Sequence, residues 1–205
     1  MNDNIEKLRI EDAIFTFIDV ETTGLSSRRA RVCEVAAVSF RGAERLGELS
    51  ELVDPGCPIP PECTQVHGIT DAMVKGRPAF GAITPRLLDL LEGSVLVAHN
   101  AEFDLGFLCM EFSKAGLKFP ERPVLDTLSL ARKNWKFQSN RLGNIAAELR
   151  IPNDNWHRAL ADVEMTRKIF ERFAAELSAA GAMTVADLIL KSGAAPRVPQ
   201  KQDTF

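Results

Sequence analysis

The sequence contains no apolar run long enough to cross a membrane, and we expect no secretory leader. It has no Gly-Lys pair, which excludes a P-loop, so we expect no use of energy from nucleotide hydrolysis. Its few cysteines form no paired framework and should be reduced; they are Cys33, Cys57, Cys63 and Cys109. These absences favour a cytoplasmic protein without membrane contact.

Strong positive charge is also lacking, because 25 basic residues are offset by 28 acidic ones and the net charge is −3. A surface that wraps a nucleic-acid duplex needs many cations against the phosphates, so that class of function is not favoured. Two basic groups could still meet phosphates over a short footprint, or be ordinary solvated faces; they are Arg28, Arg29 and Arg31, and Arg132, Lys133 and Lys136.

The 205 residues, 45% of them apolar, fit one domain with a sizeable core and no internal repeats. Apolar, β-prone runs predict strands at 13–20, 32–41, 45–53, 94–98 and 123–126. Helical periodicity predicts helices near 79–92, 101–115, 127–133, 141–149 and 158–179, with a last short helix at 184–191. A turn at residues 41–44 should make the first three strands an antiparallel meander.

We expect the folded domain to cover residues 1–192. Residues 193–205 are Gly, Ala, Pro and polar types that cannot bury enough apolar surface to order themselves, so they predict a flexible tail.

The first segment that indicates chemistry is FIDVETTGL, where an apolar run ends in two acids. Apolar residues on both faces of the run predict a central buried strand. Asp19 and Glu21 are two apart, so both side chains should project to the same side. Side by side at a buried strand end they would repel each other, and a divalent cation removes the repulsion. The alternative is a solvated strand end.

The second segment, AHNAEFDLGFL, predicts a short strand followed by a helix, with Asn100 as a candidate N-cap. Asp104 would lie in the first turns of that helix. The helix dipole favours an acid there, so Asp104 is explained either as part of an acidic site or as an ordinary helix-start residue.

The third segment, HRALADVEMTRKIF, opens a long amphipathic helix. His157 and Asp162 are five apart, about 140° of rotation on a continuous helix. They could converge only if His157 precedes the first turn. A histidine there suits a proton acceptor that must reach a water, and a loop histidine without a role is the alternative.

These three segments resemble the DEDDh family of 3′→5′ exonucleases, and within it the proofreading epsilon subunits of bacterial DNA polymerase III. The resemblance runs from about residue 14 to residue 175 and includes VDPGCPIPPECTQVHGITDAMV, VLDTLSLAR and SNRLGNIAAELRIP. It implies a ribonuclease-H-like fold, an α/β fold whose mixed five-stranded sheet is flanked by helices.

The resemblance also implies a role for each motif position. Two Mg²⁺ or Mn²⁺ ions would be held by Asp19, Glu21 and Asp162 with support from Asp104, and His157 would be the general base. The 3′-terminal nucleotide would be held by Thr22, Thr23, Gly24, Leu25, Glu62 and His67. Two such ions, about 3.5–4 Å apart, can clamp the attacking and leaving oxygens of a phosphodiester. An ordinary polar turn is the alternative for residues 22–25.

His67 and His99 could each have another role. Residues 60–70 are expected to form a loop. Cys57, with Cys63 and His67 of this loop, suggests a zinc site, but the spacing fits no usual finger and no fourth ligand is evident. His99 is either a second catalytic residue or a hydrogen-bonded core residue, and its place between a buried strand and a helix favours the core.

The expected activity is release of nucleoside 5′-monophosphates from DNA 3′ ends in proofreading or repair. An RNA-trimming exonuclease and a non-catalytic nucleic-acid binder are the alternatives, because no residue visibly reads the 2′-hydroxyl. The partners would be single-stranded DNA 3′ ends, a DNA polymerase subunit bound in trans, and a sliding clamp. The ending Gln200-Lys201-Gln202-Asp203-Thr204-Phe205 loosely resembles clamp-binding peptides but departs from them at Asp203; a random polar tail is the alternative.

Overall fold

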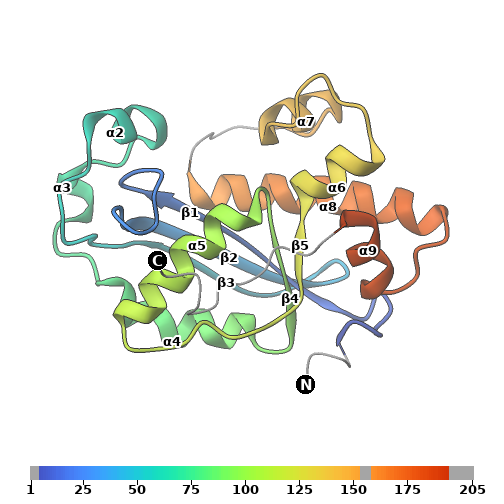
Figure 1. The fold of residues 1–205 in the computed structure, drawn as a ribbon, viewed down its shortest axis with the longest axis horizontal. Coiled ribbons are helices and arrows are strands. Elements are labelled where there is room, and N and C mark those ends of the chain that lie inside the picture. The colour runs from blue at the N-terminus through green and yellow to red at the C-terminus, as the bar shows by residue number, and fades with distance from the viewer. Residues whose placement is uncertain (1–4, 153–157, 194–205) are drawn as a thin grey trace.

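The computed structural model describes residues 5–152 and 158–193, which form one mixed sheet between two layers of helices. The sheet has five strands in the order β3-β2-β1-β4-β5 (Figure 1). The strands are β1 (Ile14–Thr22), β2 (Val32–Arg41), β3 (Glu44–Leu52), β4 (Ser94–Ala98) and β5 (Val124–Asp126). Strands β1 to β3 are antiparallel neighbours, whereas β4 runs parallel to β1 and β5 parallel to β4.

Helices cover both faces of this sheet (Figure 1). One face packs against α4 (Phe80–Leu91) and α5 (Ala101–Lys114). The other packs against α8 (Ala159–Ala179), with α6 (Thr127–Asn134), α7 (Leu142–Glu148) and α9 (Val185–Ser192) beside it. Two short helices, α2 (Pro61–His67) and α3 (Asp71–Val74), lie at the end of the sheet where β1 finishes.

Strand β1 is central because both of its faces are apolar and alternate between the two cores. Phe15 and Phe17 face α8, where Phe170 packs against them with ring centroids 4.8 and 5.5 Å away. Ile18 and Val20 join the core on the α4 and α5 side. Burial on both faces fixes the register of β1, because a slip of one residue would reverse every side chain.

The predicted α/β class, ribonuclease-H-like architecture and antiparallel meander are confirmed, and every predicted strand and helix has a counterpart within a few residues. The sequence-based prediction was wrong around residues 60–70, where it expected a loop and the structure forms α2. Pro61 starts this helix with its preset φ, and Gly68 ends it in the left-handed conformation at φ 73°.

A second difference concerns Asn100, which takes the N-cap position of α5 but does not cap with its side chain. Its backbone is left-handed, at φ 69°. The N–H groups at this helix start are instead satisfied by Asp126, whose Oδ1 accepts from Asn100 N at 2.8 Å. Long-range contact therefore replaces the local cap that the sequence suggested.

Within residues 5–152 and 158–193, no helix combines the length and apolar character that crossing a membrane requires. The predicted tail, apart from Gly193, lies outside the described residues, as does His157.

Candidate active site

The candidate site lies at the carboxyl end of β1, beyond the point where pairing with its parallel neighbour stops. Strand β4 pairs with β1 only from Ile14 to Phe17, so the later residues of β1 pair with no strand except β2. Asp19 and Glu21 belong to this open stretch and share the face of Phe15 and Phe17, which is the face covered by α8.

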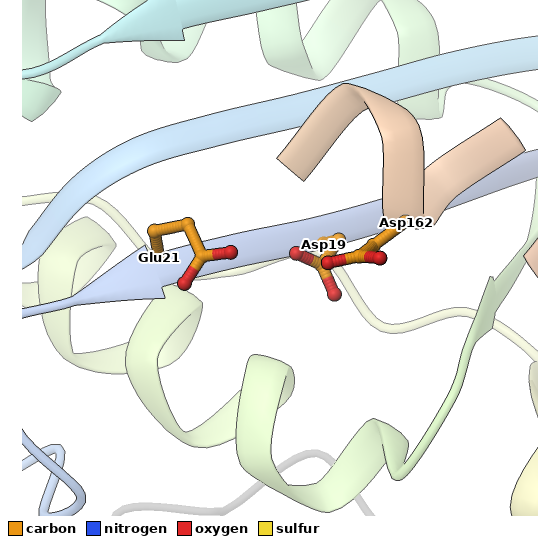
Figure 2. Close-up of side chains that lie close together, drawn as sticks. All are labelled: Asp19, Glu21 and Asp162. Atoms are coloured by element: carbon orange, nitrogen blue, oxygen red, sulfur yellow. The ribbon is translucent and has the colours of Figure 1, made fainter. Parts of the chain in front are cut away.

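Asp162, in the first turn of α8, completes a group of three carboxylates. One oxygen from each of Asp19, Glu21 and Asp162 lies within 4.8 Å of the others. Figure 2 shows Asp19 and Asp162 side by side, with Glu21 further along β1 and turned toward them. Across residues 5–152 and 158–193, this is the group of acidic, histidine or cysteine side chains close enough to share an ion.

Asp104 approaches from α5, on the opposite face of the sheet. Its side chain is 3% exposed, and Oδ1 accepts a hydrogen bond from the Val20 N–H at 3.2 Å. That N–H lies beyond the end of the β4 pairing and would otherwise be an unpaired donor at a buried strand edge. Asp104 is outside the group of three, yet its charge acts on Asp19.

The electrostatics of these acids are dominated by burial and by their mutual repulsion. Burial raises the pKa of Asp19 well above its usual range, and the charges of Asp104, Glu21 and Asp162 raise it further. Burial, then Asp162 and Glu34, raise the pKa of Glu21 to about 8. Burial likewise raises the pKa of Asp104, against the opposing effect of the Val20 N–H.

This donor set fits a hard divalent cation. All the converging atoms that the described residues contribute are carboxylate oxygens, which Mg²⁺ and Mn²⁺ prefer, with none of the thiolate or imidazole groups typical of zinc among them. A cation would also offset the repulsion that, after burial, raises the pKa of Asp19 and of Glu21. Three of the four acids predicted to hold metal are therefore brought together from two elements, β1 and α8, whereas Asp104 lies outside the group on α5.

Backbone and hydroxyl hydrogen bonds join the two ends of the loop that follows β1. Thr23 N donates to Arg31 O at 2.9 Å, and Arg31 N donates to Thr23 Oγ1 at 3.0 Å. The loop between them presents Leu25, which is 90% exposed. A hollow of about 270 Å³ separates this loop from Phe103 and Gly106 of α5.

Arg31 does not serve as the phosphate-facing cation suggested by its basic neighbours. Its Nε and Nη2 donate to the two oxygens of Glu111 at 2.7 and 2.8 Å. Glu111 is only 2% exposed and also accepts from Val32 N at 3.3 Å. A partly buried ion pair to α5 therefore fixes the end of the Leu25 loop.

His67 lies behind the same segment, at the end of α2. Its Nδ1 accepts the Ile69 N–H at 3.1 Å, which leaves Nε2 as the donor, 3.3 Å from the Thr22 carbonyl oxygen. Glu62 is on the exposed side of this helix. The cysteines once considered with His67 do not form a metal group with it within the described chain.

His99 is a hydrogen-bonded residue beside the core, as the sequence favoured. Its Nε2 donates to Asn140 O at 3.0 Å, and Nδ1 is 2.9 Å from Thr127 Oγ1. Burial lowers its pKa, which keeps the ring neutral. These contacts join the β4–α5 turn to the segment before α7.

Sequence reasoning missed the acids that support the site. Glu34 in β2 binds the start of α8, and Asp126 binds the start of α5. A signal was available for Glu34, because it is the lone charge inside the apolar run VCEVAAVSF. A charge in such a strand must find a partner when it is buried.

Metal-free stability should fall as pH rises through the range set by Glu21. The carboxylate of the unfolded chain loses its proton near the ordinary glutamate pKa of 4.5, whereas the folded one has a pKa of about 8. The stabilising contribution is therefore full below the unfolded value and is lost as pH approaches 8. In EDTA, the melting temperature of the wild type should drop from pH 5 to pH 8 more steeply than that of Glu21→Gln. Parallel curves for the two proteins would contradict this account.

The comparisons with known proteins agree with this geometry. The model of the family described as Exonuclease matches residues 16–170, which is more than half of the chain. DNA polymerase III PolC-type from Listeria monocytogenes is 37% identical over 164 residues, covering 80% of this chain and 11% of that protein. The 3′-5′ exonuclease DinG from Bacillus subtilis is 37% identical over 158 residues, covering 76% and 17%.

Solved structures share the overall fold of this chain. Exonuclease X in complex with 5′ overhanging duplex DNA is 27% identical, with a TM-score of 0.67 over 87% of this chain and 99% of that chain. An Escherichia coli exonuclease I complex with single-stranded DNA has a TM-score of 0.70 over 83% and 42%, and at 19% identity shows the fold alone. The resemblance seen in the motifs is thus confirmed, and the chain belongs to the exonuclease family.

Proposed function

We propose that this protein is a metal-dependent 3′→5′ exonuclease that releases nucleoside 5′-monophosphates from DNA. The observation that carries the proposal is the convergence of Asp19, Glu21 and Asp162 at the open end of β1, with the pKa of Asp19 and of Glu21 raised. Family membership supports the same chemistry.

The site residues would divide metal binding and proton transfer between them. Asp19, Glu21 and Asp162, with Asp104 behind them, would hold two Mg²⁺ or Mn²⁺ ions. When bound, these ions supply a Lewis acid for the phosphodiester and lower the pKa of an attacking water. His157 would accept the proton of that water, since a neutral histidine is a competent base near pH 7. In the sequence it directly precedes Arg158, the N-cap residue of the helix that carries Asp162.

The terminal nucleotide would be held by the segment after β1. Leu25 is exposed on a loop whose two ends are joined by hydrogen bonds between Thr23 and Arg31. It can therefore contact a base without the loop having to reorder. Thr22 follows Glu21 at the end of β1, and Gly24 precedes Leu25 in the loop. His67 would contribute by holding the Thr22 carbonyl, and Glu62 would face the substrate from α2.

DNA is the favoured substrate because the relatives include a DNA polymerase and a structure solved with an overhanging DNA duplex. The chain spans only 11% and 17% of the two relatives named above. A proofreading or repair role beside DNA polymerase III, through a polymerase subunit or a sliding clamp, is therefore proposed on the PolC-type likeness. Degradation of matched 3′-labelled DNA and RNA strands by the purified protein separates DNA from RNA trimming.

Hydrolysis should require both the metal and Asp19. EDTA should abolish release of mononucleotides, and Mg²⁺ or Mn²⁺ should restore it. Asp19→Asn should be inactive while its melting temperature in EDTA is at least that of the wild type, because it removes a buried, repelled charge. Full activity of metal-stripped protein would refute the mechanism.

Removing the proposed base should slow turnover without weakening metal binding. We expect His157→Ala to lower kcat by on the order of 10²–10⁴-fold, the usual contribution of a positioned general base. The carboxylates remain, so Mn²⁺ affinity by calorimetry should stay at the wild-type value. An unchanged rate would leave His157 without a catalytic role.

The substrate should need a free 3′ end. A linear strand labelled at its 5′ end should shorten stepwise, with mononucleotides as products, whereas a circular single strand of the same composition should persist. Cutting of the circle would show an endonuclease instead.

A further inference from the structure

The start of α8 is capped by a residue from the sheet. Arg158 occupies the N-cap position but makes no side-chain cap. Instead, Oε2 of Glu34 accepts the Ala159 N–H at 3.0 Å. The first N–H groups of a helix have no intrahelical partner and attract negative charge. Glu34, only 2% exposed, therefore closes this helix end from β2.

Arg158 binds the same carboxylate with its side chain. Nε lies 3.1 and 3.2 Å from the two oxygens of Glu34, and Nη2 lies 2.6 Å from Oε1. The outer part of Arg158 stays accessible, since its side chain is 45% exposed. A guanidinium fork on a carboxylate fixes direction as well as charge, which a lysine cannot reproduce.

This pair is joined to the candidate metal ligands on both sides. On the sheet, Glu34 lies opposite Glu21 in the β1–β2 register, an arrangement of like charges that is unfavourable alone. The positive charge of Arg158, paired with Glu34, opposes that repulsion. On the helix, Asp162 N donates to Arg158 O at 3.1 Å, so the turn that carries Asp162 starts at the anchored residue.

We propose that Glu34 and Arg158 are positioning residues that hold the first turn of α8 so that Asp162 can share a divalent cation with Asp19 and Glu21. The proposal rests on the proposed function in that the three acids bind metal. Neither Glu34 nor Arg158 is among the converging ligands. They affect metal binding indirectly, by fixing the position of the Asp162 side chain.

Two conservative variants test this proposal. Arg158→Lys keeps the charge but loses the fork, and Glu34→Gln keeps an acceptor for Ala159 N but loses the ion pair. Both should weaken Mn²⁺ binding, measured by calorimetry without substrate, by about 10- to 100-fold, the usual effect of losing a residue that orients a ligand. The double variant should be little worse than the worse single, because the two residues act as one unit.

Arg172→Lys is the matched control. Arg172 is on the same helix and also pairs with a glutamate, Glu176, at 3.0 Å, but both side chains are largely exposed. Its Mn²⁺ affinity and melting temperature should match the wild type, because exposed pairs of this kind contribute little.

The outcomes separate this proposal from the proposed function. Wild-type protein that binds Mn²⁺ but degrades no DNA would remove the exonuclease function and leave the positioning test readable. Wild-type Mn²⁺ affinity in both variants, even with a lowered melting temperature, would show a purely structural pair and overturn the proposal. If Glu34→Gln does not fold, Arg158→Lys decides alone, since its side chain lies at the surface.

Discussion

Repulsion between buried carboxylates is the constraint on which the arrangement of this protein depends. Burial raises the pKa of Asp19, Glu21 and Asp104, and nearby charges, that of Asp162 among them, raise the pKa of Asp19 and Glu21 further. A protein gains no stability by gathering acids in this way. The arrangement is understandable if the folded scaffold is built to present oxygen ligands to cations, with the core supplying the stability that the site costs.

The scaffold meets this constraint by placing the acids on elements that other contacts hold rigidly. Strand β1 is fixed by apolar packing on both faces and by strands on both sides of its first half. Helix α5 is fixed at its start by Asp126, and helix α8 by Glu34. These two acids receive N–H donors, whereas Asp19, Glu21 and Asp162 point at one another. Acids thus serve two purposes here: some accept N–H groups at a helix start, and others converge on one space.

The loop that presents Leu25 also combines a residue that can face a ligand with residues that hold the backbone in place. Its exposed tip is suited to contact with a ligand, while its end is held by the ion pair of Arg31 with the buried Glu111. A side chain that must meet a substrate is best carried by backbone that does not have to order itself on binding. The basic charge in the sequence near this loop is therefore partly structural.

The sequence by itself determined the order of strands and helices, the central place of β1 and the identity of the acids. Those features follow from periodicity, from apolar runs and from motifs that are contiguous in the chain. It also indicated that His99 supports the core. The short helix α2 and the uncapped Asn100 were predicted incorrectly, because a neighbour distant in sequence determined the local structure around Asn100, and Pro61 and Gly68 bounded a helix too short for clear periodicity.

Only the tertiary structure decided which charges work together. Asp162 meets Asp19 across more than a hundred residues of chain, and Glu34 meets Arg158 across 124. No local pattern encodes such pairs, since each depends on the strand register and on where a helix docks. The partnership of Arg31 with Glu111 shows the same point, because a guanidinium that looks free in the sequence is committed once α5 packs beside it. Sequence thus names the chemical groups, and packing determines which of them face a ligand and which hold the others in place.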